Sequence, residues 1–218
     1  MKILITSISD RKEMYDITFT RFKEYCDKHN YDLSTYNEPL DTSRHIAWSK
    51  ITVLQNKMRD EPNYDYYIWI DDDIYITDIN KSIEELLKPY PFENILMSAD
   101  VYPAYPLNSG FIVCKNNKFV EEFFKIVWTL GPQLKKEWEH GWEQDAITLL
   151  YRQNMDKIKI VPHTVIQSFY RDYGLPPEFK WKQGHFSAHV TGMPLDKRLK
   201  ILAIIKNICE KNENKKEI

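Results

Sequence analysis

The stretch Tyr64–Asp78, YDYYIWIDDDIYITD, decides how the rest of the chain is interpreted. An aromatic, apolar run typical of a buried strand stops abruptly at three consecutive carboxylates, Asp71, Asp72 and Asp73. Adjacent carboxylates repel one another, so such a cluster at a strand end indicates a cation site. In extended backbone the side chains of Asp71 and Asp73 leave the same face, and Asp72 points away. The pattern predicts a hard divalent cation shared by Asp71 and Asp73, and a solvated acidic turn is the alternative.

The segment before this stretch has the pattern of a βαβ unit. Residues 2–8 form a short apolar strand, apolar residues recur with helical spacing over Met14–His29, and Tyr31–Tyr36 predicts a second strand. A strand, a helix and a strand of these lengths predict parallel pairing, with ligands bound at the carboxyl ends of the strands. We therefore expect Thr6 and Ser7 at the ligand edge.

A helix is predicted over Ala47–Arg59, with its apolar residues on one face and Lys50 off that face. The plainer interpretation of Lys50 is a solvated helix lysine. The alternative is a cation that reaches toward a phosphate group of a ligand.

Strands and helices continue to alternate beyond the acidic cluster. The spacing of Ser82 and Glu85 predicts a capping box within a helix over Asp78–Leu87, and Gly131-Pro132 predicts the end of an aromatic-rich helix. The remaining predicted elements are strands at Ile95–Ala99, Leu107–Cys114 and Ile158–Val161, a loop at Trp138–Trp142, and helices at Phe119–Leu130, Glu143–Tyr151 and Leu195–Cys209.

Polar side chains gather at several of these element ends. Gly110 leaves room for a close approach to the backbone, or marks a β-bulge. Acids in the first turn of the helix at Glu143 are also favoured by the helix dipole alone. The polar candidates are Asp100 after one strand, Asn108 and Ser109 at the start of the next, and Glu143, Gln144 and Asp145.

A second informative stretch is Trp181–Pro194, WKQGHFSAHVTGMP. If this backbone is extended, His185, Ser187 and His189 share a face, and Gly192 then frees the chain to turn. A lone histidine is most often structural, but an acidic pair that awaits a cation favours His189 as a metal ligand.

Composition excludes some classes of function. Lys and Arg number 30 against 32 Asp and Glu, and there is no basic block beyond a terminal lysine pair, so nucleic acid is not expected as a partner. Three scattered cysteines, with neither a signal peptide nor a transmembrane run, predict a cytoplasmic protein. The 14 Tyr, 10 Phe and 6 Trp suit a surface that stacks on sugar rings or bases.

Taken in order, the motifs are a βαβ start, a helical lysine, a strand ending in D-x-D, an N-S-G strand, an E-Q-D helix start and a late H-x-x-G. Together they resemble the metal-dependent glycosyltransferases of the GT-A type. The similarity is to glycogenin and the related bacterial galactosyltransferases, and to the yeast galactosyltransferase and plant xyloglucan xylosyltransferase family. The resemblance implies an α/β, Rossmann-like GT-A fold, with a mixed, mostly parallel central sheet flanked by helices.

The resemblance covers most of residues 1–195, which we expect to form a single domain. Residues 196–218 are expected to form a C-terminal helix and a charged, flexible tail. The compact length suggests one module of a larger polypeptide. The implied reaction moves a hexose from a UDP-sugar donor to a glycan or glycoprotein acceptor, with Mn²⁺ or Mg²⁺ as cofactor.

Residue roles carry over by position from the resemblance. This sequence reads E-Q-D where glycogenin-like enzymes show D-Q, so the register of the pair that positions sugar hydroxyls is open between Glu143 and Asp145. Asp72 is grouped with the donor site, although its side chain is expected to be solvated or structural. The implied metal ligands are Asp71, Asp73 and His189; the donor-binding residues are Thr6, Ser7, Lys50, Asp71, Asp72, Asn108, Ser109 and Gly192; the catalytic candidates are Asp145, Glu143, Gln144 and Asp100.

Two alternatives belong to other classes. One is a sugar-nucleotide-binding module without turnover. The other is a metal-dependent nucleotidyltransferase or phosphohydrolase, which requires a second set of acidic ligands that the sequence does not show.

Overall fold

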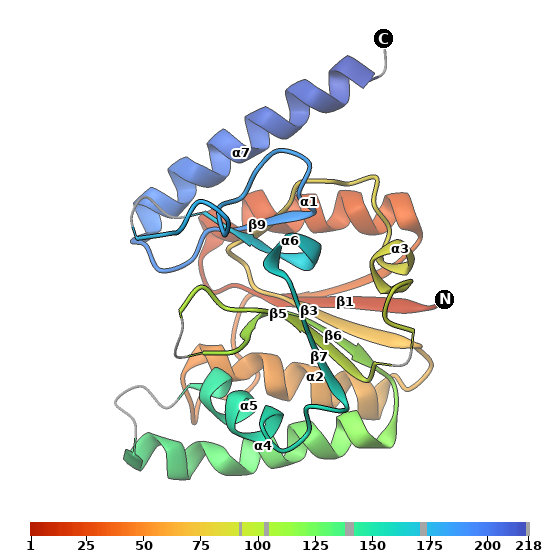
Figure 1. The fold of residues 1–218 in the computed structure, drawn as a ribbon, viewed down its shortest axis with the longest axis vertical. Coiled ribbons are helices and arrows are strands. Elements are labelled where there is room, and N and C mark those ends of the chain that lie inside the picture. The colour runs from red at the N-terminus through yellow and green to blue at the C-terminus, as the bar shows by residue number, and fades with distance from the viewer. Residues whose placement is uncertain (92, 103–104, 138–141, 171–173, 217–218) are drawn as a thin grey trace.

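The computed structural model describes residues 1–91, 93–102, 105–137, 142–170 and 174–216, and a central sheet with helices on both faces dominates it (Figure 1). The sheet has six strands in the order β2-β1-β3-β6-β5-β7. Strand β6 is antiparallel to both of its neighbours, whereas the other pairings are parallel. The strands are β1 (Ile3–Ile8), β2 (Asp32–Tyr36), β3 (Tyr66–Ile70), β5 (Ile95–Ser98), β6 (Asn108–Lys115) and β7 (Ile158–Val161).

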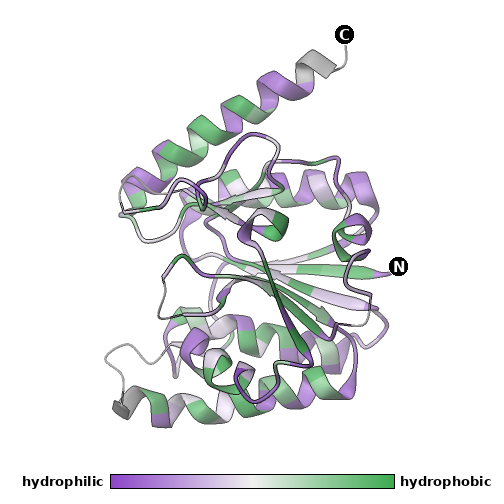
Figure 2. Ribbon diagram, viewed as in Figure 1, coloured by the Kyte–Doolittle hydropathy of each residue, from purple (hydrophilic) through white to green (hydrophobic). Residues whose placement is uncertain are grey.

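Two apolar clusters fill the spaces on either side of this sheet, because its strands bury residues on both faces. Figure 2 shows the covering helices as alternating hydrophobic and hydrophilic bands, as amphipathic helices require. One face is covered by α1 (Lys12–His29), α3 (Ile83–Leu87) and α6 (His163–Ile166); the other is covered by α2 (Ser49–Asp60), preceded by the 3-10 turn η1 (Ile46–Trp48), and by α4 (Lys118–Glu137) and α5 (Glu143–Tyr151).

A second, three-stranded sheet positions the C-terminal part of the chain. It has the order β4-β9-β8 and consists of β4 (Ile74–Ile76), β9 (Ser187–His189) and β8 (Ser168–Phe169). Helix α7 (Leu195–Lys216) follows, and its last turns extend beyond the other elements (Figure 1). None of the helices in the described part of the chain is long and apolar enough to cross a membrane.

The predicted end of the aromatic-rich helix at Gly131-Pro132 is wrong, because α4 continues to Glu137. A proline inside a helix leaves the carbonyl four residues earlier without its N–H partner. Here that carbonyl belongs to Trp128, and Nη1 of Arg44 donates to it at 2.6 Å. The guanidinium also stacks on the Trp128 ring, 3.6 Å from its centroid. A cation from a distant loop therefore replaces the missing hydrogen bond.

Helix α7 continues to Lys216, beyond the end predicted at Cys209. Glu213 in this extension pairs with Arg21 of α1, whose side chain is only 3% exposed. The guanidinium also donates to the backbone carbonyl of Ile76 at 2.8 Å. The ion pair gives the polar end of α7 a fixed partner. Of the loop predicted at Trp138–Trp142, only Trp142 is among the described residues, and there it precedes α5 as the N-cap.

Candidate metal and donor site

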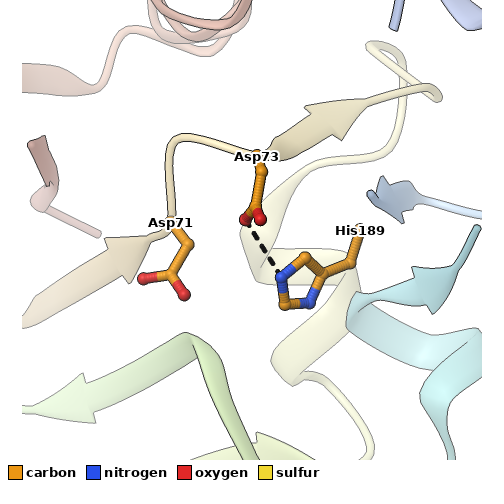
Figure 3. Close-up of side chains that lie close together, drawn as sticks. All are labelled: Asp71, Asp73 and His189. Atoms are coloured by element: carbon orange, nitrogen blue, oxygen red, sulfur yellow. Dashed lines mark ion pairs between the residues drawn. The ribbon is translucent and has the colours of Figure 1, made fainter. Parts of the chain in front are cut away.

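Asp71, Asp73 and His189 converge on one space at the carboxyl end of β3 (Figure 3). One ligand atom from each of the three side chains lies within 4.8 Å of the other two. Nε2 of His189 lies 3.0 Å from Oδ1 of Asp73. The predicted proximity of two residues more than a hundred positions apart is therefore present in the structure.

Backbone pairing brings these three residues together. β4 and β9 are antiparallel, with Ile74 opposite His189. The amide of Val190 donates to the carbonyl of Asp73 at 2.8 Å, and the amide of Asp71 donates to the carbonyl of Gly110 at 2.8 Å. The site is therefore anchored to both sheets.

Gly110 shows why the N-S-G strand contains a glycine. A Cβ built at this position would lie 2.6 Å from Cε1 of His189. The close approach predicted at Gly110 is therefore made by the imidazole of the candidate metal ligand. The alternative also has support, because the β5–β6 register shifts between Met97 and Ser98.

Asp73 has a cation on each side. Nη1 of Arg198 lies 2.8 Å from Oδ2, opposite the His189 contact at Oδ1. Burial by itself would raise the pKa of Asp73, but the charge and hydrogen bond of His189, together with Arg198, outweigh burial and hold the pKa at about 2. Asp73 is thus a carboxylate across the physiological pH range.

Lys50 is not a solvated helix lysine, and its ammonium group contacts protein carboxylates. Its ammonium group is buried, and its Nζ lies 3.1 Å from Oδ1 of Asp71 and 2.7 Å from Oε1 of Glu143. It also donates to the carbonyl of Ser109 at 3.1 Å. Burial lowers the pKa of Lys50, but the two carboxylates more than compensate, so the pKa is raised. Lys50 therefore orients the first carboxylate of the D-x-D pair.

Of the two roles expected for Asp72, solvated or structural, the structure shows the structural one. Its side chain is buried and pairs with the guanidinium of Arg11, and Ser9 Oγ donates to Oδ2 at 2.5 Å. Burial and the neighbouring Asp73 raise the pKa of Asp72 to about 6, against the lowering effect of Arg11. Asp72 lines the pocket but is held by the chain itself.

Thr6 and Ser7 do not border the pocket, which corrects their predicted place beside the donor. Both side chains are fully buried, and their hydroxyls donate to carbonyls of β3, that of Ile68 at 3.0 Å and that of Ile70 at 2.6 Å. The lining begins at the next residue, Ile8. The carboxyl end of β1 does form the ligand edge, but the lining begins one residue later than predicted.

The three residues of the E-Q-D motif at the start of α5 each have a different partner. Glu143 faces Lys50, whereas Gln144 donates to Oδ2 of Asp100 at 3.1 Å. Asp145 accepts from the backbone amide of Trp142 at 3.0 Å, which is the helix-start role given as its alternative. These contacts make Gln144, rather than Asp145, the partner of Asp100.

The amide groups beside Asp100 form a connected set. Asp100 Oδ2 accepts from Nδ2 of Asn108 at 2.8 Å, and Oε1 of Gln144 accepts from the amide of Ser109 at 3.0 Å. Asn108 Oδ1 accepts in turn from Gln167 at 2.7 Å. Polar groups that are fixed in this way suit the recognition of hydroxyl groups.

The side chains of this site other than those of Thr6, Ser7 and Gln167 line one cavity of about 630 Å³. Gly192, with φ of 71°, lies in its wall. Three lining residues, Ser9, Arg11 and Arg198, are not among those predicted from the sequence. The rule that selected Thr6 and Ser7 includes Ser9 and Arg11 if it is extended past the strand end, whereas helical periodicity offers no signal for Arg198.

Comparison with known proteins agrees with this geometry. The sequence model of the galactosyl transferase GMA12/MNN10 family matches residues 4–105. Galactomannan galactosyltransferase 1 of Cyamopsis tetragonoloba is 27% identical over 116 residues, which are 50% of this chain and 26% of that protein. The probable alpha-1,6-mannosyltransferase MNN10 of Saccharomyces cerevisiae is 25% identical over 188 residues, 70% of this chain and 47% of that protein. The chain thus spans about half or less of the length of these relatives.

Solved structures show the same fold. A glycosyltransferase involved in the glycosylation of the major capsid of PBCV-1 superimposes with a TM-score of 0.77 at 21% identity, over 94% of this chain and 100% of the other. The galactosyltransferase LgtC, solved with donor and acceptor sugar analogs, gives a TM-score of 0.58 at 10% identity, over 97% and 96%.

The chain therefore has the fold of the GT-A glycosyltransferases and is similar to them, which confirms the predicted fold class and resemblance. Within that class, the N-terminal half is similar to the galactosyl transferase GMA12/MNN10 family.

Proposed function

We propose that this chain moves a hexose from a nucleotide-diphosphate sugar, with a UDP-sugar as the expected donor, to a hydroxyl of a glycan or protein-linked acceptor. Mn²⁺ or Mg²⁺ is the proposed cofactor. The names of the two sequence relatives, a galactosyltransferase and a probable mannosyltransferase, support a hexose. A cytoplasmic location stays a proposal, supported by three free and buried cysteines.

The residues present fit a divalent cation. Asp71, Asp73 and His189 would hold it with two carboxylates and an imidazole, a set that suits Mn²⁺ or Mg²⁺ better than a thiolate-binding metal. Nε2 of His189 is the ring nitrogen that faces the carboxylates, 3.0 Å from Oδ1 of Asp73, and Nδ1 is buried without a hydrogen-bond partner in the described part of the chain. When bound, the cation supplies positive charge for the departing diphosphate.

The chain's own groups have distinct tasks around that centre. Lys50 keeps the Asp71 carboxylate in place through its buried pair. Asp100 is partly exposed in the pocket, and its contacts with Asn108 and Gln144 make it the carboxylate best placed to meet a sugar or acceptor hydroxyl. Glu143 is engaged by Lys50, which argues against its use as a free base.

The observation that carries the proposal is the convergence of Asp71, Asp73 and His189 within one cavity. The test is release of nucleotide diphosphate from a panel of nucleotide sugars, with and without Mn²⁺. We expect metal-dependent turnover that is lost in Asp73→Asn and retained in the matched variant Asp60→Asn, whose carboxylate is exposed on α2. Absence of metal-dependent turnover with every donor would contradict the proposal.

The same experiment separates the alternatives. A binding module would be stabilised by a nucleotide sugar in thermal unfolding but would release no product. A two-metal nucleotidyltransferase requires a second acidic set, and a single candidate metal cluster is found among the described residues.

A further inference from the structure

Arg198, in the first turn of α7, occupies one side of the candidate metal site. Its Nη1 donates to Oδ2 of Asp73 at 2.8 Å, and its Nε donates to the carbonyl of Met193 at 2.7 Å. The side chain is 19% exposed and lines the cavity. Within the described ranges no acceptor is found for Nη2, so part of the guanidinium remains able to bind a ligand.

Both oxygens of Asp73 are therefore engaged by the chain itself, Oδ1 by His189 and Oδ2 by Arg198. A divalent cation at Asp73 would lie beside a fixed guanidinium of like charge. A buried ion pair is not broken cheaply, because each partner is left as an uncompensated buried charge. A metal ion can replace Arg198 at the carboxylate, but Arg198 then needs another anion.

We propose that Arg198 exchanges partners, from Asp73 in the metal-free site to the donor's diphosphate in the loaded site. This inference rests on the proposed function and concerns how that site is filled. The planar fork of a guanidinium matches phosphate oxygens, which it binds in bidentate fashion. Gly192, in the segment between β9 and α7, lines the same cavity as Arg198.

The exchange couples the two ligands. A metal ion alone leaves Arg198 without an anion, and a nucleotide alone must compete with Asp73 for the guanidinium. The two together leave every charge paired. Coupling between two ligands is reciprocal, so each should strengthen the binding of the other.

The test measures Mn²⁺ affinity from the loss of the free-ion EPR signal, and UDP affinity at saturating Mn²⁺ by calorimetry. In Arg198→Gln we expect Mn²⁺ alone to bind about 5-fold tighter or more, and UDP with Mn²⁺ to bind about 5-fold weaker or more. Lys200→Gln is the control, because it makes the same charge change on α7 at a side chain that is 77% exposed. It should change neither affinity.

If Arg198 had a merely structural role, its replacement could not strengthen the binding of Mn²⁺ and weaken the binding of UDP at the same time. If Arg198→Gln leaves the affinity for Mn²⁺ alone unchanged or weakened, the exchange is refuted, while metal-dependent turnover would leave the proposed function intact. Wild-type protein that binds neither Mn²⁺ nor UDP would refute the proposed function itself. If Arg198→Gln does not fold, Arg198→Lys keeps the charge without the fork. That variant should bind Mn²⁺ as the wild type does and UDP more weakly, and unchanged UDP affinity would overturn the inference.

Discussion

Replacing Gly110 by alanine tests the link between the central sheet and the candidate metal site. The glycine does not adopt a left-handed φ, so the backbone accepts alanine and the effect must come from the new methyl group. That Cβ would lie 2.6 Å from Cε1 of His189, whereas ordinary contacts begin at 3.4 Å, so the ring must move by about 0.8 Å. Asp73 and the stacked ring of Phe169, with centroids 5.6 Å apart, restrict that movement.

Metal–ligand distances tolerate only about 0.2 Å, so a shift of this size should lower Mn²⁺ affinity about 10- to 100-fold. Overpacking should also lower the free energy of unfolding by about 1–3 kcal/mol, measured by urea denaturation in EDTA. The control is the same substitution in a His189→Ala background, where both imidazole contacts are gone and the contact with Asn108 Oδ1 at 3.0 Å remains, so most of the stability loss should disappear. An equal loss in both backgrounds, or an unchanged Mn²⁺ affinity in Gly110→Ala alone, would refute the reasoning.

Three further predictions concern stability. Lys50→Met should cost about 3–5 kcal/mol in urea denaturation at pH 7, because two carboxylates lose their buried cation; a loss below about 1 kcal/mol would contradict the assigned role. Arg44→Ala should cost about 1–3 kcal/mol by leaving the Trp128 carbonyl without a donor, and Pro132→Ala, which restores an N–H, should recover part of that loss. Asp73 has a folded pKa near 2, below its ordinary value of 3.8, so its stabilising contribution is present above about pH 4 and is lost as the pH falls toward 2. The difference in unfolding free energy between wild type and Asp73→Asn, measured in EDTA, should therefore shrink between about pH 4 and pH 2. A constant difference would be contrary evidence.

Sequence patterns correctly predicted the helices and turns that are determined by residues close together in the chain. The bounds of α5 match the predicted Glu143–Tyr151, and Ser82 and Glu85 form the predicted capping box. Alternation and the D-x-D spacing also placed Asp71 and Asp73 at the strand end where they lie. Each of these features depends on residues within a few positions of one another, which is the range over which periodicity and capping rules operate.

The features that were missed depend on distant partners. Gly131-Pro132 normally ends a helix, but the rule does not account for a guanidinium from residue 44 that satisfies the free carbonyl. The last helix was predicted to end at Cys209, but α7 continues past it, and Glu213 in the continuation pairs with Arg21, 192 residues away. His189 was found only through the resemblance and the expectation that an acidic pair needs a third ligand. Helical periodicity treats Arg198 as one more polar residue, because no pattern in the sequence says what its guanidinium meets.

The acidic cluster Asp71–Asp73 raises a physical question, because three adjacent carboxylates in a mostly buried position should destabilise the fold. In the structure, each carboxylate is paired with a cation from a different element. The pairs are Asp71 with Lys50 of α2, Asp72 with Arg11 before α1, and Asp73 with Arg198 of α7 and with His189 of β9. The chain therefore balances these charges before any ligand arrives. On the proposed function, a divalent cation would enter by displacing a side-chain cation, so its affinity would depend on where the displaced charge can go. An anionic donor would provide that destination, and the binding of the diphosphate and of the metal would then be parts of one electrostatic exchange.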